Sequence, residues 1–255
     1  MIRLFIKDQL APGADIALGA STAHYLKNVM RQKPGDVFLA FNGENGEFAA
    51  TIKALAKKAG VARLGEQRRG PEPVPDISLL IAPVKRAALE TIIQKSVELG
   101  AKEIAFVKTD RIAAPEPNYQ RLDAIAMEAT EQCGRLSPPA IKPMAPLEEA
   151  LDRIGATHAV IFCDEAGDDL NEPWGGREGR AEPMLDALER AGSSAKSAAL
   201  LIGPEGGFSP DERLRLQGHE GVIPVTLGPR ILRADTAVIT ALALWQAALG
   251  DLASR

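Results

Sequence analysis

The sequence has few cysteines, few aromatic residues and no long apolar run. Its two cysteines, Cys133 and Cys163, are too far apart in the sequence for a disulfide framework or a metal motif, so we expect a protein of the reducing cytoplasm without bound metal. Residues 237–250 form the most apolar stretch. It is interrupted by Thr240 and Gln246 and is shorter than the roughly 20 apolar residues of a membrane span. With no apolar signal-peptide core either, no membrane partner is expected.

The charges are distributed unevenly. Residues 1–70 hold six Lys and five Arg against three Asp and three Glu, a formal charge of +5, whereas residues 71–255 carry −9. A basic segment joined to an acidic one favours a polyanion as the partner of residues 1–70. Ordinary scatter of surface charge is the alternative.

The proline-rich stretch 71–76 predicts a stiff linker between two domains, because three prolines in five positions fit neither a helix nor a central strand. Before it, residues 37–41 and 47–52 are typical of short strands, and residues 22–31 of one short helix. We therefore expect residues 1–70 to form a small, mostly β domain such as a barrel.

Residues 77–255 follow a different pattern, in which apolar strands alternate with helices. This alternation predicts an α/β domain with a parallel sheet covered on both faces. Strands are expected at 77–84, 104–107, 158–163 and 198–202, and helices at 87–99, 119–135, 147–154, 184–190 and 236–249.

Two glycine-rich segments, 202–212 and 227–237, each follow an apolar run and precede a helix. Two such turns can build one ligand pocket at the strand ends of an open α/β sheet. A pair of tight turns that bind nothing is the alternative. In the second segment, Asp235 is expected to cap the last helix.

The first segment also limits the kind of ligand. Ser209 is expected as the helix N-cap, with Pro210 at the first helical position and Glu212 completing a capping box. Asp211 and Glu212 then occupy the helix N-terminus, where a phosphate would otherwise bind. The dinucleotide and P-loop patterns are both absent. A neutral or cationic ligand is therefore favoured.

The motifs GPEGGFS at 203–209 and LGPRILRADTA at 227–237 resemble the signature of the bacterial 16S ribosomal RNA uridine-N3 methyltransferases of the RsmE type. That family belongs to the SPOUT class of S-adenosylmethionine-dependent enzymes. The segments 24–36, 95–100 and 131–135 resemble further motifs of the same family in the same order. The resemblance therefore covers most of the chain.

The resemblance implies a PUA-like β-barrel followed by a SPOUT α/β domain with a deep trefoil knot near 198–250. It also implies a homodimer that binds S-adenosyl-L-methionine and acts on 16S rRNA within the 30S subunit. Carried over by position, the residues expected to bind the cofactor are Ile202, Gly203, Glu205, Gly206, Leu227, Gly228, Ile231, Leu232 and Arg233. Those expected to bind RNA are His24, Lys27, Arg31, Lys33 and Arg135.

Methylation at uracil N3 requires a route for the N3 proton and donors for the charge on the uracil oxygens. We expect Arg135 to hold a phosphate or a uracil oxygen and Gln132 to contact the base, with Glu131 or Glu205 accepting the proton. An exposed i,i+4 ion pair is the alternative for Glu131 and Arg135. Methylation of a ribose hydroxyl or another base stays open, as does a non-catalytic RNA-binding protein. The segment 171–180 resembles an extra loop without an assigned role.

Overall fold

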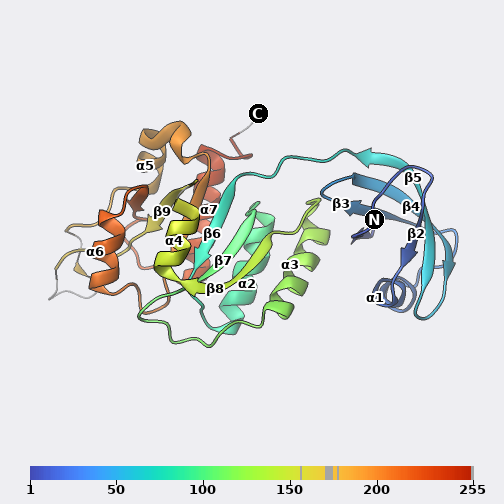
Figure 1. Ribbon diagram of the computed structural model, residues 1–255, viewed down its shortest axis with the longest axis horizontal. Helices are drawn as coiled ribbons and strands as arrows, with labels where there is room; N and C mark the ends of the chain where they lie inside the picture. Colours follow the sequence, from blue (N-terminus) through green and yellow to red (C-terminus); the bar gives the residue numbers. More distant parts are fainter. Residues whose placement is uncertain (156, 170–174, 177, 254–255) are drawn as a thin grey trace. The chain divides into compact units, whose positions relative to one another are not determined.

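The computed structural model describes residues 1–255 except 156, 170–174, 177, 254 and 255. Its contacts divide the chain into two compact units (Figure 1). The first unit combines Met1–Pro73 with Met127–Pro138, and the second combines Val74–Ala126 with Pro139–Arg255. The division falls inside the proline-rich stretch, but the first unit also takes a segment from beyond it. Within the described residues, no helix has the length and apolar character to cross a membrane.

A five-stranded sheet in the order β1-β3-β4-β5-β2 forms the first unit. Its strands are β1 (Arg3–Phe5), β2 (Asp15–Leu18), β3 (Val37–Asn42), β4 (Gly46–Leu55) and β5 (Gly60–Arg69). β1 pairs with β3 in parallel and the other pairs are antiparallel. Alternate side chains such as Phe38, Ala40 and Ile52 are buried in one core, as the period of a strand requires. The expected small β unit is confirmed, but sequence patterns missed three of its strands, β1, β2 and β5.

The single helix expected at 22–31 is wrong. The chain forms α1 (Ala20–His24) and then a π-helical turn, η1 (Tyr25–Val29), in which the Met30 N–H donates to the Tyr25 carbonyl at 2.9 Å. Arg31 then adopts a left-handed φ of 55° and ends the turn. The buried Leu26 anchors this segment in the core, so its polar residues face solvent.

Arg3 ties the segment 127–138 into the first unit. Its Nε donates to the Glu47 carboxylate at 2.7 Å. Its Nη atoms donate to the carbonyl oxygens of Thr130, Glu131, Gly134 and Arg135 at 3.2, 2.9, 3.2 and 3.0 Å. These carbonyls lie at and beyond the end of α3 (Tyr119–Cys133), where a helix has no partners of its own. One guanidinium therefore binds two carbonyls of the last turn of α3 and two of the residues that follow it.

The second unit is built on a parallel sheet in the order β11-β9-β10-β6-β7-β8. Its strands are β6 (Ile77–Ile81), β7 (Glu103–Lys108), β8 (Ala140–Pro146), β9 (Ala159–Cys163), β10 (Ala198–Ile202) and β11 (Val222–Val225). All five pairings are parallel, which confirms the expected sheet type. Every residue of β6 and β10 is buried, as in a sheet covered on both faces.

Helices pack on both faces of this sheet (Figure 1). They are α2 (Arg86–Glu98), α4 (Leu147–Gly155), α5 (Met184–Ala191), α6 (Pro210–Gly218) and α7 (Ala234–Ala248). Leu80 and Leu201 share one core with α4 and α6, whereas α7 packs against β10, α2 and α5. The expectation that Asp235 caps α7 is wrong: Arg233 is the N-cap, and the Asp235 carboxylate accepts from the Thr236 N–H at 2.9 Å.

Candidate functional site

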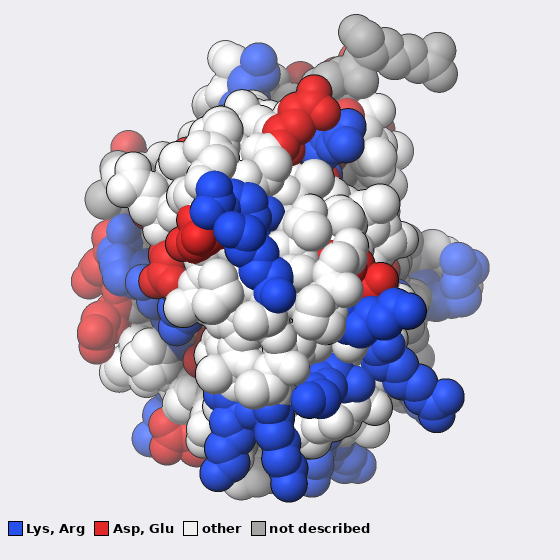
Figure 2. Space-filling model, turned by 90° about the vertical axis from the view of Figure 1, so that its right-hand side faces the viewer, with Lys and Arg blue, Asp and Glu red and all other residues white. Residues whose placement is uncertain are grey.

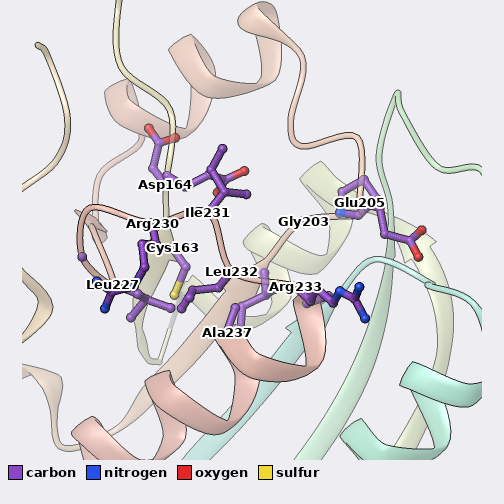
Figure 3. Close-up of a pocket in the computed structure, with 15 residues that line it drawn as sticks. Cys163, Asp164, Gly203, Glu205, Leu227, Arg230, Ile231, Leu232, Arg233 and Ala237 are labelled. Atoms are coloured by element: carbon purple, nitrogen blue, oxygen red, sulfur yellow. The ribbon is translucent and has the colours of Figure 1, made fainter. Parts of the chain in front are cut away.

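A pocket lies where β9, β10 and β11 end on one edge of the parallel sheet (Figure 3). It encloses about 200 Å³, far more than the ~30 Å³ share of one water. Its lining comes from the segments after these strands and from the start of α7: Cys163, Asp164, Glu165, Ile202, Gly203, Pro204, Glu205, Leu227, Gly228, Arg230, Ile231, Leu232, Arg233, Ala234 and Ala237. Backbone and apolar side chains thus make up most of the wall.

The first glycine-rich loop is shaped by the ring of Phe208. A Cβ on Gly203 would lie 2.7 Å from the Phe208 ring, so only glycine fits there. The ring is buried and meets Phe162 of β9 edge to face, with 5.0 Å between ring centroids. This packing fixes the loop against the sheet and leaves the backbone of Gly203 in the pocket wall.

The capping box expected at the start of α6 is confirmed. The Ser209 side chain accepts from the Glu212 N–H at 3.2 Å, and Glu212 Oε2 accepts from the Ser209 N–H at 2.8 Å. The second oxygen of Glu212 accepts from the Asp110 N–H at 2.8 Å, and the Ser209 hydroxyl donates to the Asp110 carboxylate at 2.6 Å. The helix N-terminus is therefore closed to an external anion and is linked to the loop after β7.

The second glycine-rich loop is held by short polar contacts. Gly228 has a φ of 113°, which side-chain-bearing residues rarely adopt. Its N–H donates to the Thr226 hydroxyl at 3.3 Å, and that hydroxyl donates to the Gly228 carbonyl at 3.2 Å. Arg180 donates to the Pro229 carbonyl at 3.3 Å. The loop is thus shaped locally before α7 begins.

The residues at the end of β9 contribute a thiol and two carboxyl groups to the pocket wall. Burial raises the pKa of the Cys163 thiol to about 12, so it is not a thiolate nucleophile. The Asp164 carboxylate is occupied, because Arg213 donates to it through Nε and Nη2, both at 2.9 Å. Burial, and then the charge of Asp164, raise the pKa of the Glu165 carboxyl. Because Arg230 and Arg233 also line the pocket, the apolar wall and the closed N-terminus of α6, rather than net charge, favour a ligand without phosphate.

The structure brings the residues expected to bind the cofactor into this pocket, except Gly206. The residues in the pocket are Ile202, Gly203, Glu205, Leu227, Gly228, Ile231, Leu232 and Arg233. Figure 3 shows Glu205 and Arg233 on one side of the pocket and Asp164 and Arg230 on the other. Gly206 lies instead against Arg111. Sequence reasoning missed Cys163 to Glu165, although the end of a strand beside β10 was an available signal.

The expected catalytic residues belong to different units. Glu205 is exposed on the pocket wall in the second unit, whereas Glu131, Gln132 and Arg135 belong to the first. Glu131 Oε1 accepts from the Phe5 N–H at 3.0 Å, and burial raises the pKa of the Glu131 carboxyl.

The helix expected at 119–135 ends two residues early, so Arg135 does not lie on it. α3 ends at Cys133, and Gly134 leaves the helix with a φ of 92°. Cys133, the last residue of α3, is exposed.

The residues expected to bind RNA at the start of the chain are His24, Lys27, Arg31 and Lys33. All four are exposed. Lys27 donates to the Leu55 carbonyl at 3.4 Å, and Asn28 donates to His24 Nδ1 at 2.8 Å. Figure 2 looks onto the first unit, where Lys and Arg side chains predominate in the lower half of the face. Such a surface suits a polyanion.

The acidic residues after β9 do not gather into a metal site. The described residues contain no group of three or more His, Cys, Asp or Glu side chains arranged to hold an ion. The loop 171–180, whose role was unassigned, lies partly outside the described residues, at 171–174 and 177. Of its remainder, Arg180 contacts the second glycine-rich loop, as described above.

Comparison with known proteins extends these observations. A model of an RNA methyltransferase domain matches residues 70–246, and a model of an RNA methyltransferase PUA domain matches residues 18–64. The ribosomal RNA small subunit methyltransferase E of Rickettsia conorii is 31% identical over 94% of this chain and 93% of its own. The enzyme of that name from Synechocystis is 32% identical over 94% of this chain and 76% of its own.

A solved structure has the same fold over nearly the whole chain. The crystal structure of ribosomal RNA small subunit methyltransferase E from Neisseria gonorrhoeae, bound to S-adenosyl methionine, superposes with a TM-score of 0.77. It is 28% identical and covers 97% of each chain. With a family model covering most of its length and close agreement in fold, the chain belongs to the RNA methyltransferase family and carries that family's PUA domain near its N-terminus.

Proposed function

We propose that this protein transfers a methyl group from S-adenosylmethionine to N3 of one uridine in 16S ribosomal RNA, the position conventionally numbered 1498, within the 30S subunit. The observation that carries the proposal is the pocket built by the two glycine-rich loops. A family relative of the same fold was crystallised with S-adenosyl methionine. The relatives' shared name supports ribosomal RNA of the small subunit as the substrate.

The residues that line the pocket fit this cofactor. S-adenosylmethionine supplies an electrophilic methyl group on a cationic sulfonium and carries no phosphate. The apolar side chains of Leu227, Ile231 and Leu232 are suited to its uncharged parts, and the partly buried Glu165 to its positive charge. Backbone groups of both loops, at Gly203 and Gly228, offer hydrogen bonds to its polar edges. The closed N-terminus of α6 agrees with a ligand that lacks phosphate.

The proposal includes a SPOUT architecture, in which the two loops belong to a deep trefoil knot near 198–250, and a homodimer in the cytoplasm. Residues 1–70 then serve as an RNA-binding domain and 71–76 as its linker. His24, Lys27, Arg31 and Lys33 contact the RNA backbone, together with Arg135. The exposure of the first four residues and the basic charge of their segment support this role.

The chemistry requires removal of the uracil N3 proton and stabilisation of the negative charge that remains on the ring. Arg135 and Gln132 are proposed to hold the uracil oxygens or the target phosphate, and Glu131 or Glu205 to accept the proton. The raised pKa of Glu131 suits a base, because a carboxylate with a higher pKa takes a proton more readily. Glu205 has the advantage of lying in the pocket wall itself.

The test is methyl transfer from labelled S-adenosylmethionine to 30S subunits that lack N3-methyluridine, with the product nucleoside identified by mass spectrometry. N3-methyluridine at a single site is expected. Label on a ribose hydroxyl or another base would refute the assignment of the target atom. Arg135→Ala should lose turnover while keeping its affinity for S-adenosylhomocysteine, and unchanged turnover would exclude the role given to Arg135.

A further inference from the structure

Three exposed cations stand at the edge of the sheet where β6 and β7 end. Lys85 follows β6, Lys108 is the last residue of β7, and Arg111 lies three residues further on. Ile81 and Phe106 are partners in the parallel register of the two strands, so both strands end at the same edge. We call Lys85, Lys108 and Arg111 the strand-end cations.

The strand-end cations adjoin the pocket. The Ala82 N–H donates to the Ile202 carbonyl at 3.1 Å, which places the chain leaving β6 beside the first glycine-rich loop. Arg111 Nη1 donates to the Gly206 carbonyl at 3.3 Å. A Cβ on Gly206 would lie 3.4 Å from the Cβ of Arg111, so the two backbones are in close contact. Together with the Asp110 links to α6, these contacts clamp the loop after β7 onto the rim of the pocket.

Among the residues that the structure describes, none of the three strand-end cations forms a salt bridge. Glu90 is bound by Arg86 at 2.8 Å and by Arg121 at 2.7 Å. The first turn of α2 contains no acidic residue. Across the part of the chain that the structure describes, Lys85 and Lys108 have no carboxylate within salt-bridge distance. This edge therefore presents positive charge beside the pocket.

We propose that the strand-end cations bind the backbone phosphates that flank the target nucleotide as its base enters the pocket. The proposal rests on the proposed function, which makes RNA the substrate. Flexible lysine ammonium groups suit phosphates of variable position, and an arginine guanidinium suits a phosphate held in one place. Asp110 is next to Arg111 in the sequence, and its carboxylate already accepts from the Ser209 hydroxyl at 2.6 Å.

The first experiment compares the double variant K85A/K108A with K142A/K196A, a control that removes the same charge. Lys142 and Lys196 are exposed, and both lie away from the strand ends, in β8 and just before β10. Binding of 16S rRNA and of 30S subunits is measured across a range of salt concentrations, without cofactor. Loss of two phosphate contacts should reduce the slope of log K against log salt by about 1.5.

K85A/K108A should also raise KM for 30S subunits, leaving kcat and the affinity for S-adenosylhomocysteine unchanged, and K142A/K196A should match wild type throughout. A wild-type salt slope in K85A/K108A would overturn the assignment of the two lysines. If the wild-type protein transferred no methyl group to 30S subunits, the proposed function would be refuted instead. The two outcomes are distinguishable because RNA binding is measured without cofactor and does not depend on methyl transfer.

Arg111 needs its own measurement because it also contacts the first glycine-rich loop. R111A should reduce the salt slope by about 0.8, and R111K should restore most of it, because phosphate binding requires mainly a positive charge. Affinity for S-adenosylhomocysteine is measured in parallel. A variant R111A that loses cofactor affinity but keeps the wild-type salt slope would show that Arg111 only supports the loop, and would overturn its assignment to RNA.

Discussion

Glu212 joins two loops at the edge of the pocket. Although it lies outside the sheet, its replacement should lower the unfolding free energy substantially. Its side chain is 3% exposed, and each carboxylate oxygen accepts one backbone N–H, from Ser209 and from Asp110. Glu212→Ala leaves both donors without an acceptor. A buried donor that loses its partner costs about 1–3 kcal/mol, so the two together should cost about 3 kcal/mol, since both are only partly buried.

Asp211 provides the matched control. It is exposed in the same first turn of α6, so Asp211→Asn loses only its interaction with the helix dipole, about 0.3–1 kcal/mol. Thermal unfolding of the full chain, followed by tryptophan fluorescence, separates the two variants, because Trp245 is buried in the same unit. A loss of 3 kcal/mol should lower Tm by about 6–12 °C.

Cofactor affinity gives the second readout for Glu212. In Glu212→Ala the first glycine-rich loop is no longer bound to the loop after β7, so S-adenosylhomocysteine should bind more weakly. In Asp211→Asn this link is intact, so the affinity should not change. The reasoning would be refuted if the two variants had the same Tm, because the buried carboxylate would then contribute no more than an exposed one.

Three other perturbations have defined outcomes. Arg3→Lys should lower the unfolding free energy by about 3 kcal/mol in denaturant titrations, because an ammonium cannot replace five directed donor contacts; a loss below 1 kcal/mol would contradict this. Glu165→Gln should raise the unfolding free energy at pH 7 and leave it unchanged at pH 4. The raised pKa of Glu165 means that the folded protein binds its proton more tightly than the unfolded chain does. The wild type therefore loses stability as the pH rises above the ordinary carboxyl pKa of about 4.3, and the Gln variant does not. A difference independent of pH would exclude that cause. A thiol reagent should label Cys133 in the native protein and Cys163 only after unfolding, as mass spectrometry of the labelled peptides would show.

Sequence patterns predicted the features that depend on neighbouring residues. The capping box from Ser209 to Glu212 is a local motif, and the structure contains it. The strand β10 is a continuous apolar run and β6 is interrupted only by Ser78. A sheet covered on both faces requires such runs, and both strands were predicted for that reason. The parallel sheet follows from their alternation with helices.

Features that depend on distant partners were missed. β1 has three residues, too few for a periodic pattern, and it forms by pairing with β3. Glu165 belongs to no motif of the sequence, and it lines the pocket only because the ends of β9 and β10 lie side by side in the sheet. The second hydrogen bond of Glu212 reaches Asp110, a hundred and two positions away in the sequence. No local pattern contains such contacts.

The discontinuity of the first unit bears on how the chain folds as it is made. A ribosome completes residues 1–73 first, but the segment 127–138, whose carbonyls Arg3 binds, emerges only after β6, α2 and β7 have been synthesised. At 5–20 residues per second, this interval lasts roughly 3–10 s. During that time the Arg3 guanidinium and the Phe5 amide have to rely on water in place of their final partners. The first unit to leave the ribosome is thus completed by a segment of its own that is synthesised later, and translation alone delays its closure.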